Sequence, residues 1–88
     1  MKEIKWHSHA RARLLERSID LRLVHKALEH PDEVRGIGAQ KIIHKRYVDS
    51  QSNKEYLLRI FLEDRHGEWT ILSVYRTSKI GKYWREKR

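Results

Sequence analysis

Four side chains that could take part in chemistry recur at helical spacing near the start of the chain: His9, Arg13, Glu16 and Arg17. Residues three, four, seven or eight positions apart lie on one side of a helix, so the four form a single stripe. An imidazole can take a proton from a ribose 2′-hydroxyl or give one to a leaving oxygen, and a guanidinium can bind phosphate with two hydrogen bonds. The stripe therefore has the residue types that RNA cleavage requires. An exposed helix face with ordinary pairing of Glu and Arg has the same pattern.

A second group lies in the segment from Val74 to Lys79, which contains an Arg, a Lys, a phenol and two hydroxyls. We expect it at the end of a strand, where functional side chains are common. Arg76 would neutralise charge on a phosphate, Lys79 would hold a neighbouring phosphate, and Tyr75 is a candidate proton carrier. A phenol plays that part only where its pKa lies below the usual value of about 10. The structural alternative is that Tyr75 packs in the core and Arg76 pairs with Glu55 across a hairpin.

Other residues that could hold a metal or a nucleotide lack the required spacing. His7 and His9 would point to one side of an extended segment, but no carboxylate or third His completes the site, and the chain has no Cys. Gly36 and Gly38 lack the third Gly, the strand and the helix of a dinucleotide-binding loop. We therefore expect no metal and no cofactor. The remaining histidines are interpreted as surface residues: His25, His30, His44 and His66.

The charge of the chain indicates the kind of partner. Its 88 residues include 20 Lys and Arg against 12 Asp and Glu, a formal net charge of +8. Such an excess is typical of proteins that bind phosphate-rich partners, whereas charges that only solvate a surface are usually balanced in sign. The absence of Cys, of a signal peptide and of a long apolar run favours a cytoplasmic protein with no membrane partner. The length suits one domain, residues 1–88, with any active site in a surface groove.

Two helices and a sheet are expected to position these residues. Ser8 and Asp20 are candidate N-caps for helices over residues 8–17 and 21–29, and Pro31 follows the second helix. Four β-rich segments come next, separated by turn sequences. They cover residues 33–37, 41–48, 55–63 and 69–77. The pattern predicts an α+β fold in which two N-terminal helices pack on a four-stranded, mainly antiparallel sheet.

Alternation in the last two strands predicts two faces of the sheet. Tyr56 and Tyr75 would belong to the face that the helices cover, together with the apolar residues in register with them. The opposite face would carry two guanidinium groups, Arg59 and Arg76, among apolar side chains. Its other members would be Leu57, Phe61, Thr70, Leu72 and Val74. This face suits a nucleic-acid groove, a docking site for a partner helix, or cover by the C-terminal segment.

Three parts of the sequence together resemble the domain-of-unknown-function 4258 family, small bacterial and archaeal proteins that look like relatives of the RelE/ParE toxins. The matching residues are His9-Ala10, Arg13, Glu16-Arg17 and Ile19, then His30-Pro31-Asp32, and finally Val74 to Ile80 with Lys82-Tyr83-Trp84. The resemblance implies two N-terminal helices on an antiparallel sheet. It also implies a concave basic surface, which cuts messenger RNA in ribonuclease members and poisons DNA gyrase in ParE members. Ser18 departs from the family pattern, because many members have Gly there, and a left-handed backbone would suit Gly better.

The leading hypothesis is a toxin-like, metal-independent endoribonuclease of a toxin-antitoxin type system. Its partners would be RNA or ribosome-associated mRNA and an acidic antitoxin. The catalytic residues would be His9, Arg13, Arg59, Tyr75 and Arg76. The nucleic-acid-binding residues would be Arg17, Lys79, Lys82 and Trp84. The alternatives are a non-catalytic module that binds nucleic acid or an acidic protein through the same surface, and a ParE-like toxin directed at gyrase.

Overall fold

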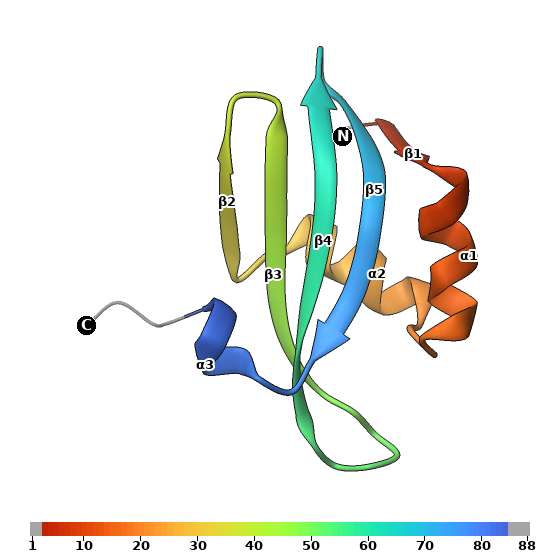
Figure 1. The fold of residues 1–88 in the computed structure, drawn as a ribbon, viewed down its shortest axis with the longest axis vertical. Helices are drawn as coiled ribbons and strands as arrows, with labels where there is room; N and C mark the ends of the chain where they lie inside the picture. The colour runs from red at the N-terminus through yellow and green to blue at the C-terminus, as the bar shows by residue number, and fades with distance from the viewer. Residues whose placement is uncertain (1–2, 85–88) are drawn as a thin grey trace.

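The computed structural model describes residues 3–84, apart from the side chain of residue 37, and combines helices with one sheet (Figure 1). In chain order the elements are β1 (Glu3–Trp6), α1 (Ser8–Glu16), α2 (Leu21–Glu29), β2 (Glu33–Ile37), β3 (Gln40–Val48), β4 (Glu55–Arg65), β5 (Glu68–Thr77) and α3 (Ile80–Tyr83). The predicted α+β class is confirmed. Within this part of the chain, no helix is long and apolar enough to cross a membrane.

The strands form one five-stranded sheet in the order β1-β5-β4-β3-β2. The neighbours from β2 to β5 are antiparallel, as the turn sequences predicted. The prediction of four strands was wrong, because β1 adds a fifth strand that runs parallel to β5, with Glu3 opposite Glu68. Ile4 and Trp6 of β1 pack against the core from this edge. A strand of 4 residues has too little alternation to be detected in the sequence.

The two predicted helices have clear N-terminal caps. Asp20 caps α2 as predicted, since its carboxylate accepts a hydrogen bond of 2.8 Å from the amide of Arg22. The prediction that Ser8 caps the first helix was wrong by one residue. His7 occupies that position, and its Nδ1 accepts from the amide of His9 at 3.3 Å.

The turn between α1 and α2 is a Schellman motif. The amide of Ile19 donates to the carbonyl of Leu14 at 3.0 Å, and the amide of Ser18 donates to the carbonyl of Leu15 at 3.3 Å. Ser18 has a φ of 53°, in the left-handed region that favours glycine. Leu14 and Ile19 are both buried in the core, so the motif fixes the entry of the chain into α2.

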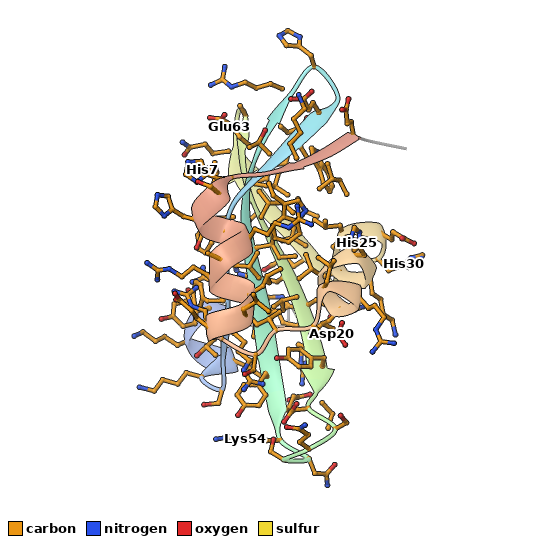
Figure 2. All side chains as sticks on the ribbon, turned by 90° about the vertical axis from the view of Figure 1, so that its right-hand side faces the viewer. His7, Asp20, His25, His30, Lys54 and Glu63 are labelled. Carbon is orange, nitrogen blue, oxygen red and sulfur yellow. The ribbon has the colours of Figure 1, made fainter. Side chains whose placement is uncertain are left out.

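The helices lie at different positions around the sheet. α2 and α3 lie on opposite sides of it, and α1 lies beside the edge formed by β1 and β5 (Figures 1 and 2). α2 packs on the sheet through Val24, Ala27 and Leu28, which are buried, while His25 on its other side is exposed. The main core also includes Ala10, Leu14, Ile19, Ile43, Leu58, Ile60, Leu62, Ile71 and Val74. We call the side of the sheet that bears α3 the outer face.

A β-bulge in β5 decides which side chains reach the outer face. Phe61 and Leu62 are consecutive in β4, but their partners in β5 are Ser73 and Ile71. Leu72 is therefore an extra residue in the ladder, and the alternation of side chains reverses after it.

The reversal shows that the predicted faces were wrong for the second half of β5. Val74 is fully buried in the main core, and Tyr75 lies opposite Arg59 on the outer face. Arg76 lies opposite Leu58, a core residue on the side that α2 covers. Arg59 and Arg76 are therefore on opposite faces of the sheet.

Candidate nucleic-acid interface

Arg59 lies in the middle of the outer face, where neighbouring strands each contribute one polar side chain. Its Nε donates to Nε2 of His44 in β3 at 3.0 Å, and its Nη1 donates to the hydroxyl of Tyr75 in β5. In β2, Glu33 pairs with His44, and its Oε1 lies 2.8 Å from Nδ1 of that imidazole. The register brings these side chains together, because each is opposite the next one in its ladder. We call Glu33, His44, Arg59 and Tyr75 the cross-strand row.

His44 is fully buried, so its interpretation as a surface residue was wrong. A guanidinium can only donate, and therefore Nε2 must accept from Arg59 while the proton of the neutral ring lies on Nδ1, facing Glu33. Burial is the largest influence on this group and lowers its pKa. The hydrogen bond to Glu33 opposes that lowering, and the charge of Arg59 adds to it. The imidazole is thus neutral at neutral pH.

Aromatic rings surround the guanidinium of Arg59. Its Cζ lies 4.1 Å from the centre of the Tyr83 ring in α3, 5.1 Å from that of Phe61 and 5.4 Å from that of Tyr75. Such cation–π contacts restrain a guanidinium without using its N–H groups. Of the five N–H groups of an arginine, one bonds to His44 and one to Tyr75. The other N–H groups are therefore chemically able to bind a phosphate oxygen.

α3 covers one end of the outer face. The ring of Trp84 lies 5.4 Å from Cζ of Arg46, measured from the ring centre. Leu57, which is opposite Arg46 in the ladder, is fully buried although it does not belong to the main core. Cover by the C-terminal segment, one of the three uses predicted for this face, therefore applies to this end of it.

The predicted stripe of α1 reaches the edge of the same face. A shallow pocket of about 170 Å³ is lined by His9, Ala10, Arg13, Arg17, Leu72 and Ser73, and we call it the α1 pocket. Arg17 connects it to the cross-strand row, since its Nη1 donates to the carbonyl of Val74 at 2.6 Å and its Cζ lies 5.9 Å from the centre of the Tyr75 ring. Arg13 also faces Glu16 at 3.6 Å, which is the ordinary pairing that the sequence left open.

Arg76 belongs to a different cluster. Its Cζ lies 4.4 Å from the centre of the Tyr56 ring, and its Nη1 lies 3.9 Å from a carboxylate oxygen of Asp49. A hydrogen bond with Tyr47 is the main cause that raises the pKa of Arg76. Glu55, its predicted partner, instead pairs with Arg46 at 3.1 Å. The structure therefore separates Arg76 from the other predicted catalytic residues.

Two basic residues follow β5 in the described part of the chain. Lys79 and Lys82 are exposed, and Nζ of Lys82 lies 5.4 Å from the centre of the Tyr83 ring. The predicted basic tail continues over residues 85–88, which lie outside the described residues.

An apolar groove of about 430 Å³ continues from the row along the sheet. Ile42 and Phe61, which are opposite each other in the ladder, contribute two of its walls. The other lining residues are Gly36, Gln40, Lys41, Leu62 and Leu72. Phe61 and Leu72 were both predicted on this face of the sheet.

The remaining histidines have simple structural positions. His7 and His9 stack with their ring centres 5.2 Å apart at the start of α1. His25, His30 and His66 are exposed, as predicted. In the part of the chain that the structure describes, no three His, Asp or Glu side chains are grouped so that they could hold a metal ion.

No family model, no curated protein and no solved structure matches the chain. The resemblance to the RelE/ParE-like proteins therefore stays a prediction, and the interface is judged on its own geometry.

Proposed function

We propose that the chain is a metal-independent endoribonuclease with a RelE-like fold, acting in the cytoplasm on RNA through the outer face and the α1 pocket. The single observation that supports this proposal most directly is the restraint of Arg59. Its guanidinium is held by His44, Tyr75 and Tyr83 in the middle of a sheet face, half-buried, with N–H groups left for a ligand. A preorganised cation of this kind stabilises charge that develops on a phosphate.

The proposed roles follow from the neighbours of Arg59. Cleavage would proceed by attack of a ribose 2′-oxygen on the adjacent phosphorus, with rupture of the bond between phosphorus and the 5′-oxygen. His9 would accept the proton of the 2′-hydroxyl. Tyr75 would protonate the leaving 5′-oxygen, and the N–H of Arg59 that already bonds to its oxygen would stabilise the phenolate left behind. The products would be a 2′,3′-cyclic phosphate and a 5′-hydroxyl.

Phosphates on either side of the cut would be bound by the remaining basic residues. Arg13 and Arg17 line the α1 pocket next to the row, Lys82 lies beside Tyr83, and Lys79 is exposed just before α3. A guanidinium suits a phosphate in a defined position because its planar fork can bind two oxygens, whereas an ammonium acts as a point charge.

Cleavage of an end-labelled, single-stranded RNA in the presence of EDTA tests the proposal. The wild-type protein should cut it and leave cyclic phosphate ends, and a 2′-deoxy residue at the cut site should abolish cleavage. His9→Ala and Arg59→Lys should each slow the reaction by at least about tenfold, because one removes the base and the other the fork. His25→Ala is the matched control, since His25 is exposed on α2, on the other side of the sheet.

Two results would contradict the proposal. One is intact RNA after incubation with folded wild-type protein. The other is equal cleavage by the wild type, His9→Ala and Arg59→Lys, which would identify a contaminating nuclease.

A module that binds RNA without cutting it is the second candidate. It is favoured by the bond between Arg59 and the Tyr75 hydroxyl, because in the free protein the proposed phosphate-binding cation and the proposed acid are bonded to each other. Under this alternative, the wild-type protein binds the oligonucleotide, Arg59→Lys weakens binding, and no product forms with any variant.

A further inference from the structure

His44 is a buried titratable group for which the proposed reaction has no direct use. Its side chain is fully buried, so it cannot contact RNA. A buried polar group normally persists only with hydrogen-bond partners, because an unpaired one costs stability. Both nitrogens of His44 have partners, Glu33 on one side and Arg59 on the other. The role of the imidazole must therefore be sought in what it does to these neighbours.

The hydrogen bonds of the row have a single consistent direction. Arg59 donates from Nε to Nε2 of His44, and the imidazole donates from Nδ1 to the carboxylate of Glu33. The other tautomer would place N–H groups of His44 and Arg59 against each other, and the Glu33 carboxylate would lose the imidazole donor and keep only the Nε of Arg35, 3.0 Å away. Glu33 therefore selects the tautomer that can hold Arg59.

We propose that His44 and Glu33 are positioning residues for Arg59, which keep its guanidinium in the orientation that binds the scissile phosphate, and do so only while His44 is neutral. The proposal rests on the function proposed above for the phosphate contact. The orientation itself is a property of the protein without RNA and can be measured separately.

Protonation of His44 would reverse its effect on Arg59. The imidazolium has no acceptor at Nε2, and it would place a second positive charge against the guanidinium. The charged groups that act on the ring are Glu33 and Arg35 from β2 and Arg59 from β4. Of these, Glu33 alone favours the protonated form, and burial outweighs it, so the pKa of His44 lies below its ordinary value of about 6.5. The guanidinium of Arg59 is therefore held in place at pH values above the pKa of His44, and it is released as the pH falls through that pKa.

NMR of the free protein tests the orientation. At pH 7.5 the Nε–H proton of Arg59 should be protected from exchange, and the nitrogen shifts of His44 should show a proton on Nδ1. His44→Gln should keep the protection, because its side-chain oxygen can accept in place of Nε2, and His44→Leu should lose it. His25→Gln is the matched control and should leave the Arg59 signal unchanged. An unprotected Arg59 Nε–H in the wild type, or a protonated Nε2, would overturn the inference.

The pH dependence of single-turnover cleavage, with protein in saturating excess, tests the consequence for catalysis. The side chain that His44→Gln introduces cannot titrate. Dividing the wild-type rate by the rate of His44→Gln at the same pH therefore cancels the effects of other titrating groups, such as His9. Between pH 7.5 and the pH at which the NMR signals show His44 to be mostly protonated, this ratio should fall by at least about fivefold, since the wild type alone loses the acceptor. A ratio that stays constant while His44 becomes protonated would overturn the inference. At pH 7.5, His44→Leu should cut at least about tenfold more slowly than His44→Gln.

The two measurements separate the inference from the proposed function. Absence of cleavage together with a protected, correctly oriented Arg59 would refute the ribonuclease and leave the positioning of Arg59 by His44 intact. Cleavage together with an Arg59 signal that does not change when His44 is replaced would support the ribonuclease and refute the positioning of Arg59 by His44. Because His44→Gln retains the buried acceptor, it keeps the test informative if His44→Leu does not fold.

Discussion

Two arginines of the same sheet show how position decides what a guanidinium does. Arg59 keeps N–H groups on the outer face beyond the two that bond to His44 and Tyr75. Arg76 lies over Tyr56 and faces Asp49 on the other side of the sheet. The first arrangement is suited to a ligand, and the second is suited to holding the β3–β4 end of the sheet together.

Replacement of Arg76 should therefore affect folding more than catalysis. Arg76→Met removes a cation–π contact, a hydrogen bond with Tyr47 and a partly exposed ion pair, and should lower the free energy of unfolding by about 1 kcal/mol. Denaturation in urea measures this loss, and single-turnover cleavage measured well below the transition should stay near the wild-type rate. A tenfold slower rate with unchanged stability would return Arg76 to the catalytic residues.

The sequence contained a signal for the pairing of Glu33 with His44 in the turn between their strands. Gly38 lies in the turn between β2 and β3, with a φ of 62°, and a short turn fixes which residues of a hairpin are opposite each other. Counting back from that turn pairs Glu33 with His44. That the pair would be buried could not be predicted, because burial depends on neighbouring side chains such as Arg59 and on the position of α3.

At the scale of elements, most boundaries could be predicted because their signals are local. Asp20 and Pro31 bracket α2, and the predicted range 33–37 for β2 coincides with the observed one. β1 and the bulge could not be predicted, because both depend on partners elsewhere in the chain. Leu72 and Val74 are both apolar, so the sequence has no polar residue that shows on which side of Leu72 the alternation reverses.

The turn between α1 and α2 offers a direct test of local strain. Ser18 has a left-handed backbone, which costs an L-residue about 1–2 kcal/mol, partly offset by the greater flexibility of glycine in the unfolded chain. Ser18→Gly should therefore raise the free energy of unfolding by roughly 0.5–1 kcal/mol. Ser78→Gly is the matched control, because Ser78 is exposed and its φ is not positive, and it should not stabilise. Equal shifts of the two midpoints in urea would refute the assignment.

At the scale of the whole molecule, part of the basic excess behind the net charge of +8 lies around the outer face. Arg13 and Arg17 lie along one edge of the outer face, and Lys82 lies near Tyr83 beyond Arg59. If these residues contact phosphates individually, the charges near this face should dominate the salt dependence of RNA binding, and charges on α2 should contribute little.

Salt titrations of binding to a non-cleavable 2′-deoxy oligonucleotide distinguish the two contributions. Each phosphate contact on a single strand adds about −0.7 to the slope of log affinity against log salt. Arg17→Met should make the slope shallower by about that amount. Lys26→Met, an exposed residue of α2, should leave it unchanged. The same change with both variants would show that the charge acts diffusely, and a flat response of the wild type would exclude phosphate contacts.

The pairing of β1 with β5 joins the first strand of the chain to its last one. Other neighbours in the sheet are hairpins, whose strands meet after short turns, whereas this contact closes a loop that contains almost every other element. Closing such a loop costs more chain entropy than closing a hairpin, so β1 is expected to join the sheet late in folding. α1 follows β1 directly, and the helix with its C-cap residue supplies His9, Arg13 and Arg17 to the α1 pocket beside β5. The folding order would therefore assemble the cross-strand row first and complete the α1 pocket only when β1 pairs with β5.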